Sequence, residues 1–240
     1  VGHVIGRTDW DEACTKEINP KVQYHFCNES LRDSFYSGNW EYQKCEKHSI
    51  FMSQAATPIK GLHFMLRAMP EILKNYPDAH LYVAGNDLTK TDSLYGKLKI
   101  SSFAKYIKRL ISEYSLEEKV TFTGTLTEQK MKERFLKSNV FVSPSTIENS
   151  PNSLGEAMLL GVPCISSDVG GVKNMLVHNL EGYIYQVDAP YMIAYYVKKI
   201  FDDAQCALII SKNAKSHAVK THNRDENLKT LLKIYRDLYE

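Results

Sequence analysis

Two glutamates, Glu148 and Glu156, stand eight positions apart in the stretch ENSPNSLGEAMLLGVP. Apolar runs that read as short strands precede and follow this stretch, so the two carboxylates lie around a strand-to-helix turn. Carboxylates in such a place accept hydrogen bonds from hydroxyl groups, such as those of a ribose or another sugar. These two side chains therefore suggest a ligand that carries hydroxyl groups.

The residues around the two glutamates also predict where a helix begins and ends. Ser150 is a suitable N-cap, and Pro151 suits the first helical position because its backbone angle φ already matches a helix. Gly161 and Pro163 are typical of the end of a helix. The prediction is a helix that starts near Asn152, directly after a strand.

Free backbone N–H groups are expected at the start of this helix, at Asn152, Ser153 and Leu154. With the positive end of the helix dipole, these amides form a site for an anion such as a phosphate or a diphosphate. Gly155 has no side chain, so we expect a ligand to approach the backbone closely there. Carboxylates beside such a site predict a ligand in which a phosphate carries sugars.

Short apolar runs alternate with longer amphipathic segments along most of the chain. This alternation predicts an α/β fold, a Rossmann-like parallel sheet with helices on both faces, which binds ligands beyond the carboxyl ends of its strands. The predicted strands cover residues 50–53, 80–84, 120–123, 140–143, 164–166 and 183–185. The predicted helices, before a helical tail, cover residues 61–75, 97–115, 128–137, 153–160, 172–177 and 191–201.

Residues before about Lys47 do not follow this alternation. Thr8 or Asp9 is suited to cap a helix that runs to Ile18, and residues 21–26 have the composition of a strand. We interpret the chain as the tail of a preceding domain with a connector (residues 1–46), one α/β domain (47–220) and a C-terminal helix (221–240).

The composition is that of a globular protein and points away from a nucleic-acid partner. The chain has 240 residues, of which 43% are hydrophobic and 24% are charged, and its net charge is +2. Its five cysteines lack short paired spacings, which favours reduced thiols, and its eight histidines do not cluster as metal ligands do. No apolar run has the length of a membrane span. We therefore expect no metal site and at most a peripheral membrane contact.

Several motifs together resemble the donor-binding half of a retaining group 1 glycosyltransferase, a family with the two-domain GT-B fold. The main motif is PSTIENSPNSLGEAMLLGVPCISS, which Gly170 and Gly171 follow. The motifs PIKG at 58–61, LYVAGN at 81–86 and VTFTGTL at 120–126 stand in the family's order and spacing. The resemblance covers about residues 46–200 and is specific for the family but not for the sugar.

The resemblance implies how individual residues bind a nucleoside-diphosphate-sugar donor. Glu156 would hold the ribose hydroxyls, and Glu148 would face the donor sugar and the reaction centre. The amides of residues 152–154 and the ammonium of Lys60 would bind the diphosphate, which makes Glu148 and Lys60 the candidate catalytic residues. The candidate donor-binding residues are Gln54, Gly85, Asn86, Thr125, Leu126, Asn152, Ser153, Leu154 and Glu156.

Gln54 is a departure from the family pattern. The family usually has Gly-Arg at the end of the first strand, where the arginine pairs with the diphosphate, and this chain has Ser53 and Gln54 there. Glutamine donates hydrogen bonds but carries no charge, so one of two expected cations is missing. Two explanations stay open: another group assists Lys60, or donor turnover is weakened.

The predicted activity is the transfer of a sugar from a nucleoside-diphosphate sugar to a glycan, a lipid or a small molecule, with retention of configuration. We expect no cofactor and no metal, an acceptor bound through the N-terminal domain, and a cytoplasmic protein that is at most peripheral at the inner membrane face. The chain holds only a part of that enzyme, so binding without efficient turnover is expected.

Other functions on related folds are less consistent with the sequence. A nucleotide-sugar epimerase of the same fold and a non-catalytic nucleotide-sugar-binding module remain as alternatives, and Gln54 favours the second. A sugar phosphorylase would need a lysine for a pyridoxal cofactor, which no pattern suggests. A dehydrogenase is disfavoured because no G-x-G-x-x-G motif follows a strand.

Overall fold

The computed structural model describes residues 1–90 and 101–239, and these residues contain a six-stranded parallel sheet. The strand order is β5-β4-β3-β6-β7-β8, so the chain starts in the middle of the sheet, moves outward to β5, and returns to β6 beside β3. The strands are β3 (Ser49–Met52), β4 (His80–Val83), β5 (Val120–Phe122), β6 (Val140–Ser143), β7 (Cys164–Ser167) and β8 (Tyr183–Tyr185). The order reverses between β3 and β6, where sheets of this kind bind their ligands.

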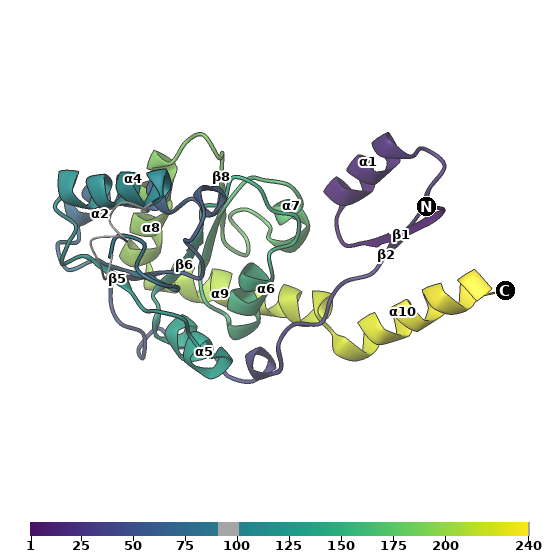
Figure 1. The fold of residues 1–240 in the computed structure, drawn as a ribbon. Helices are drawn as coiled ribbons and strands as arrows, with labels where there is room; N and C mark the ends of the chain where they lie inside the picture. Colours follow the sequence, from purple (N-terminus) through teal and green to yellow (C-terminus); the bar gives the residue numbers. More distant parts are fainter. Residues whose placement is uncertain (91–100, 240) are drawn as a thin grey trace.

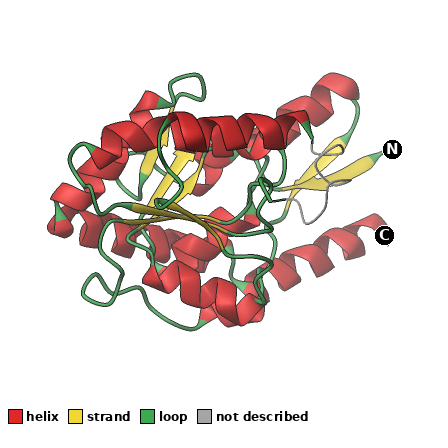
Figure 2. Ribbon diagram, turned by 60° about the vertical axis from the view of Figure 1, so that its left-hand side comes forward, coloured by secondary structure: helices red, strands yellow, loops and turns green. Residues whose placement is uncertain are grey.

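Helices cover both faces of this sheet, as Figure 1 and Figure 2 show. On one face α2 packs beside α4 and α8, and on the other face α6 packs beside α5 and α9. The helices of this part are α2 (Leu62–Leu73), α4 (Ser102–Glu113), α5 (Glu128–Lys137), α6 (Asn152–Leu160), α7 (Val172–Met175), α8 (Tyr191–Asp202), α9 (Ala204–Thr221) and α10 (Arg224–Tyr239). Two short 3₁₀ helices are η1 (Asp33–Tyr36) and η2 (Pro58–Lys60).

The prediction of a Rossmann-like parallel sheet with helices on both faces is confirmed. Each predicted strand of this sheet forms within one residue of its predicted ends. The predicted helix over 97–115 is observed as α4, and its residues 97–100 lie outside the described residues. The other predicted helices form within two residues of their predicted ends.

The predicted cap of α6 is wrong by one residue. Pro151 is the N-cap, because its backbone is extended (φ −68°, ψ 115°) and helical geometry begins only at Asn152. Ser150 lies one residue further out, and its hydroxyl lies 3.4 Å from the sulfur of Met175. Among the described residues, no side chain caps this helix.

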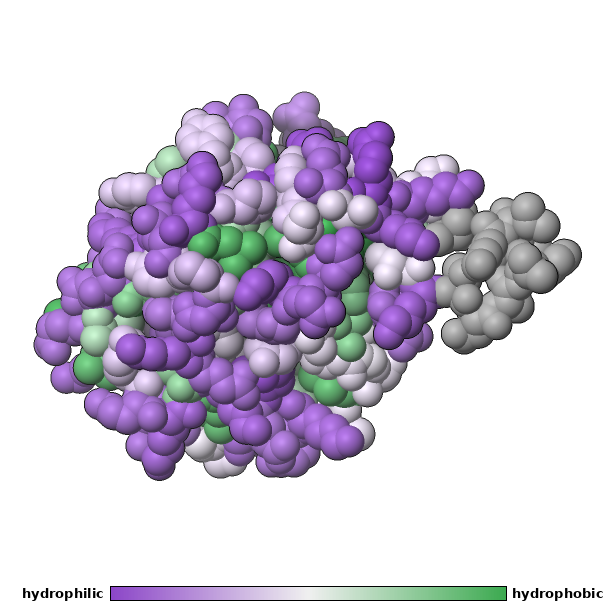
Figure 3. Space-filling model, turned by 90° about the vertical axis from the view of Figure 1, so that its left-hand side faces the viewer, coloured by the Kyte–Doolittle hydropathy of each residue, from purple (hydrophilic) through white to green (hydrophobic). Residues whose placement is uncertain are grey.

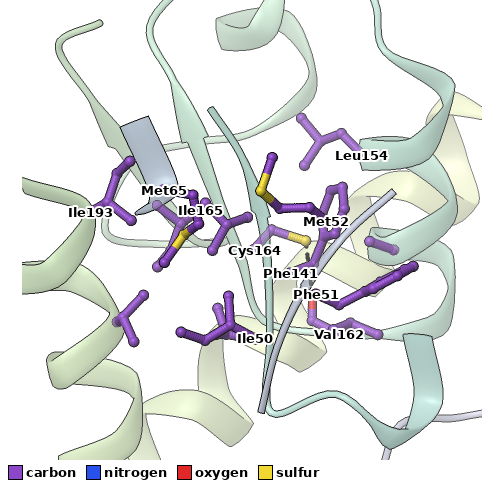
Figure 4. Close-up of a cluster of buried hydrophobic side chains, with 14 of the residues drawn as sticks. Ile50, Phe51, Met52, Met65, Phe141, Leu154, Val162, Cys164, Ile165 and Ile193 are labelled. Atoms are coloured by element: carbon purple, nitrogen blue, oxygen red, sulfur yellow. Dashed lines mark hydrogen bonds between the residues drawn. The ribbon is translucent and has the colours of Figure 1, made fainter. Parts of the chain in front are cut away.

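The hydrophobic core lies between the sheet and the helices on each face. The central strands β3 and β6 are buried along their whole length, as expected for a parallel sheet with helices on both faces. Figure 4 shows Ile50 beside Met65 of α2 and Ile193 of α8, whereas Phe51 and Phe141 project from the other face of the sheet. The alternation of side chains along each strand therefore fills both layers of the core.

The residues before β3 form a small unit and a connector. β1 (His3–Gly6) and β2 (Gln23–Phe26) pair in parallel, and α1 (Asp9–Ile18) connects them along the chain. The predicted helix and the predicted strand of this region are therefore confirmed. Thr8 is the N-cap of α1 and forms a capping box with Asp11. β1 was not predicted, because its four residues, two exposed and two half-buried, form no strong pattern. In Figure 1 this unit and α10 project from the same side of the molecule.

The outer surface over α2 and α4 is mostly hydrophilic. Figure 3 views the molecule from this end and shows polar residues with only small hydrophobic areas between them. Of the helices in the described ranges, none has both the length and the apolar character that crossing a membrane requires.

Candidate active site

A small pocket lies at the carboxyl ends of β3 and β6, where the strand order reverses. It brings together Gln54, Lys60, Glu148 and Ser153, four of the candidate residues, from two separate parts of the chain, residues 52–60 and 142–153. The pocket is lined by Met52, Ser53, Gln54, Lys60, Val142, Ser143, Pro144, Ser145, Glu148 and Ser153. These four candidate residues therefore share one small pocket.

Lys60 and Glu148 form an ion pair in this pocket. The Nζ atom of Lys60 lies 2.6 Å from Oε1 of Glu148, and the hydroxyl of Ser145 donates to the same oxygen at 2.8 Å. Both charged side chains are largely buried, with 25% and 14% of their surfaces exposed. Lys60 and Glu148 were predicted as separate site residues, and the structure shows that the ammonium has a carboxylate as its direct partner.

Two glycines allow the backbone segments that carry this ion pair to approach closely. Gly61 follows Lys60, has φ +75°, and would place a Cβ 1.8 Å from the carbonyl oxygen of Pro144. Gly170 has φ +49° and would place a Cβ 1.7 Å from the carbonyl oxygen of Glu148. Any side chain at either position would push these segments apart, so the glycines help to position Lys60 and Glu148.

The start of α6 offers two of the three expected free amides. Within the described residues, the N–H groups of Asn152 and Ser153 have no hydrogen-bond acceptor. The N–H group of Leu154 donates to the carbonyl of Pro151 at 3.0 Å. The expectation of a free amide at Leu154 is therefore wrong, because the first turn closes on the N-cap carbonyl.

Glu156 is buried in α6 and has an arginine as its partner. Only 3% of this residue is exposed, and its two carboxylate oxygens accept hydrogen bonds from Nε and Nη2 of Arg32, each at 2.7 Å. The hydrogen bonds to Glu156 raise the pKa of Arg32, against the opposing effect of burial. Arg32 was not predicted, although Glu156 stands among apolar residues in LGEAMLL, where a buried carboxylate needs a partner.

The space beside Gly155 is filled by protein. A Cβ on Gly155 would lie 2.6 Å from Nε2 of His222 and 2.9 Å from Cδ1 of Leu31. The expectation that a ligand approaches the backbone at Gly155 is therefore wrong, because the connector and the end of α9 pack there. His222 is itself buried, and desolvation lowers its pKa.

The N-terminal unit contacts the segment between the two glutamates. Asn149 accepts a hydrogen bond from the hydroxyl of Thr8 at 2.5 Å and donates to the carboxylate of Asp11 at 2.6 Å. Arg7 donates to the side chain of Asn152 at 3.3 Å and forms an ion pair with Glu29. No sequence pattern indicated these contacts.

The other candidate donor-binding residues lie further along the same edge of the sheet. Gly85 and Gly124 exchange two backbone hydrogen bonds of 3.0 and 3.1 Å, which join the ends of β4 and β5. Asn86 and Thr125 are exposed, and Leu126 is half-buried. In the described part of the chain these residues do not line the pocket with Lys60, because β4 and β5 lie one and two strands away from β3.

Comparison with known proteins identifies the family. The family model described as glycosyl transferases group 1 matches residues 41–217, from the connector to α9. The chain belongs to the group 1 glycosyltransferases. This match confirms the predicted resemblance, and the matched range contains the pocket, the ion pair and α6.

The similar proteins are longer than this group 1 glycosyltransferase chain. An uncharacterised glycosyltransferase of Methanocaldococcus jannaschii is 27% identical over 194 residues, which cover 81% of this chain and 46% of that protein. The chain spans about half the length of the curated relatives it matches.

Solved structures show the same fold. Sucrose-phosphate synthase from Thermosynechococcus elongatus superimposes with a TM-score of 0.79 at 20% identity, over 99% of this chain and 58% of that one. The Anabaena protein HepE, solved in complex with UDP-glucose, superimposes with a TM-score of 0.78 at 16% identity, over 100% of this chain and 64% of that one. At these identities the likeness shows the fold, which is that of one half of a GT-B glycosyltransferase.

Proposed function

We propose that this chain is the donor-binding part of an enzyme that transfers a sugar from a nucleoside-diphosphate sugar to an acceptor, with retention of configuration. The observation that supports this most is that Lys60, Glu148 and the uncapped start of α6 converge on one pocket at the reversal of the strand order. A cation and free amides suit a diphosphate, and a carboxylate suits sugar hydroxyls. The HepE complex with UDP-glucose, in the same fold, is consistent with such a ligand.

In this proposal the diphosphate binds between Lys60 and the amides of Asn152 and Ser153. Its negative charge would attract the ammonium of Lys60, which then stabilises the charge that develops on the leaving diphosphate. Glu148 loses part of its contact with Lys60 in the process, so its carboxylate becomes available to hydroxyls of the donor sugar. The ion pair would thus separate, with Lys60 binding the diphosphate and Glu148 binding the donor sugar.

The nucleoside is proposed to lie along α6 and the edge of the sheet. Glu156 would accept hydrogen bonds from the ribose hydroxyls, and the turns after β4 and β5 would face the base. The residues proposed for that edge are Gly85, Asn86, Thr125 and Leu126. The acceptor, which we infer to be a glycan or a lipid-linked molecule, would be bound outside residues 47–220, and the enzyme would act in the cytoplasm with at most peripheral membrane contact.

A non-catalytic module that binds nucleotide sugars is the second candidate. It is favoured by Gln54, which is exposed and lines the pocket at the place where the family resemblance implies an arginine. The pairing of Lys60 with Glu148 reduces the positive charge of the pocket further. Donor binding without sugar transfer by the complete protein would favour this candidate.

We expect at least one of UDP, GDP and ADP to bind to the chain in isothermal titration calorimetry. The affinity should be the same in the presence of a chelator, since the groups proposed to bind the diphosphate are an ammonium and backbone amides. Lys60→Met, which keeps the length of the side chain but not its charge, should weaken the interaction. The absence of a heat signal for all three nucleotides would contradict the proposed function.

Gln54→Arg should strengthen nucleotide binding by about 1 kcal/mol in this partly solvated pocket. The variant places a second cation near the diphosphate, and the gain should shrink in high salt because screening weakens exposed charge interactions. Ala56→Arg is the matched control, since Ala56 is exposed in the same loop but outside the lining of the pocket. An unchanged dissociation constant of Gln54→Arg at low salt would show that Gln54 does not face the diphosphate.

A further inference from the structure

We propose that Arg32 is a positioning residue for the nucleotide. Its guanidinium holds the carboxylate of Glu156 in the orientation that accepts hydrogen bonds from the ribose hydroxyls. The proposal rests on the proposed role of Glu156 as the ribose-binding residue. Arg32 lies in the connector, 124 positions before Glu156, and so links the N-terminal part of the chain to the donor site.

The geometry of the pair fixes the plane of the carboxylate. Nε of Arg32 donates to Oε1 and Nη2 donates to Oε2, both at 2.7 Å, which is the side-on fork of a guanidinium on a carboxylate. An ionised carboxylate has about four acceptor directions, two on each oxygen. Arg32 uses one direction on each oxygen, so one direction on each remains for a pair of hydroxyl groups.

Arg32 is itself held from its own side. Its guanidinium lies 4.7 Å from the centre of the Phe35 ring, and Phe35 is fully buried against Phe135. The N–H group of Ser34 donates to the carboxylate of Glu128 at 2.9 Å, which ties the connector to the start of α5. The guanidinium therefore has a fixed platform, and a fixed donor orients its acceptor without further loss of entropy.

Gly155 permits the close approach on which the pair depends. The connector lies directly against α6 at this residue, where a Cβ would come within 2.9 Å of Leu31. Leu31 precedes Arg32, so the absence of a side chain at Gly155 brings the arginine within reach of the carboxylate one residue further along the helix. Gly155 thus affects the site indirectly, because it lets the connector that carries Arg32 pack against α6.

Arg32 and Glu156 differ in how far their side chains are exposed to solvent. The side chain of Glu156 is 4% exposed and that of Arg32 is 44% exposed, so most of the exposed surface of the pair belongs to the arginine. A purely structural pair would only attach the connector to α6, and its loss would weaken the binding of every nucleotide equally. A positioning role predicts a loss that depends on the ribose hydroxyls.

The test compares ribonucleotides with their 2′,3′-dideoxy forms in calorimetric titrations of the 240-residue chain. UDP, GDP and ADP are each paired with the dideoxy counterpart. The unmodified chain should bind the ribonucleotide at least about tenfold more tightly than the dideoxy form, since hydroxyls bonded to a carboxylate are lost. In Arg32→Met this ratio should fall below about threefold. Arg32→Lys should give an intermediate ratio, because an ammonium keeps the charge but not the fork.

Arg224→Met is the control for attachment of the connector. Arg224 donates to the carbonyl of Leu31 at 3.2 Å and pairs with Asp33, so this variant loosens the connector without removing a contact of Glu156. The ratio should stay at the value of the unmodified chain. If Arg32→Met does not fold, Arg32→Lys decides, and an unchanged ratio in that variant overturns the proposal.

Other outcomes overturn the proposal at distinct levels. Equal weakening of both forms in Arg32→Met would show a structural pair only, and tighter binding would show that Arg32 competes with the ribose. An unmodified chain that binds the nucleotides but ignores the hydroxyls would overturn the role of Glu156 as well. A chain that binds none of the nucleotides would overturn the proposed function itself.

Discussion

Gly170→Ala is expected to reduce the free energy of unfolding by about 2–5 kcal/mol. The added Cβ would lie 1.7 Å from the carbonyl oxygen of Glu148, which is backbone and cannot rotate away. Overpacking of this kind costs about 1–3 kcal/mol, and a non-glycine residue at φ +49° costs about 1–2 kcal/mol more. Urea denaturation of the variant and the unmodified chain measures the difference.

Gly124→Ala is the matched control for this variant. Gly124 also has a positive φ, of +71°, but no described atom lies within 4 Å of the position that its Cβ would take. It should therefore show only the backbone cost of about 1–2 kcal/mol. If Gly170→Ala and Gly124→Ala lose the same stability, the close contact with Glu148 contributes nothing and the loop around Gly170 yields easily.

Glu156→Ala is expected to weaken the binding of nucleoside diphosphates by about 1–3 kcal/mol, the range for losing hydrogen bonds to a charged group. Glu148→Ala should not weaken the binding of the free diphosphate, because loss of the carboxylate releases the ammonium of Lys60 from an ion pair. The same variant should weaken the binding of the nucleotide sugar, since Glu148 is proposed to face the sugar. Titrations with UDP and UDP-glucose, and with the GDP and ADP equivalents, measure both effects.

The two glutamates are thus predicted to differ in which part of the donor they affect. Equal losses of affinity for the free diphosphate in Glu156→Ala and Glu148→Ala would contradict the assignment of roles. Thermal melting of both variants provides the control for folding. Glu156→Ala leaves Arg32 unpaired, but that side chain is 44% exposed and can be hydrated.

The fold was predictable because its pattern is local and strong. The buried strands β3 and β6 contain the apolar runs IFM and VFV, and the helices between them carry apolar residues at helical spacing. Both ends of α6 were also predictable, since Pro151 before the helix and Gly161 after it are local signals. The detail of the cap was not, because both Ser150 and Pro151 are compatible with the start of a helix, and the observed backbone angles make Pro151 the N-cap.

By itself, the sequence determined the order of strands and helices, the parallel sheet, the family, and the placement of Lys60, Glu148 and the start of α6 at one edge. These follow from periodicity and from motifs, which each depend on neighbours along the chain. Only the tertiary structure decided the partners: Lys60 with Glu148 across 88 positions, and Arg32 with Glu156 across 124. A charged side chain is compatible with many partners, and its choice depends on which backbone segments approach closely. In this protein the glycines at 61, 155 and 170 permit those approaches, and their effect appears only once the segments are packed together.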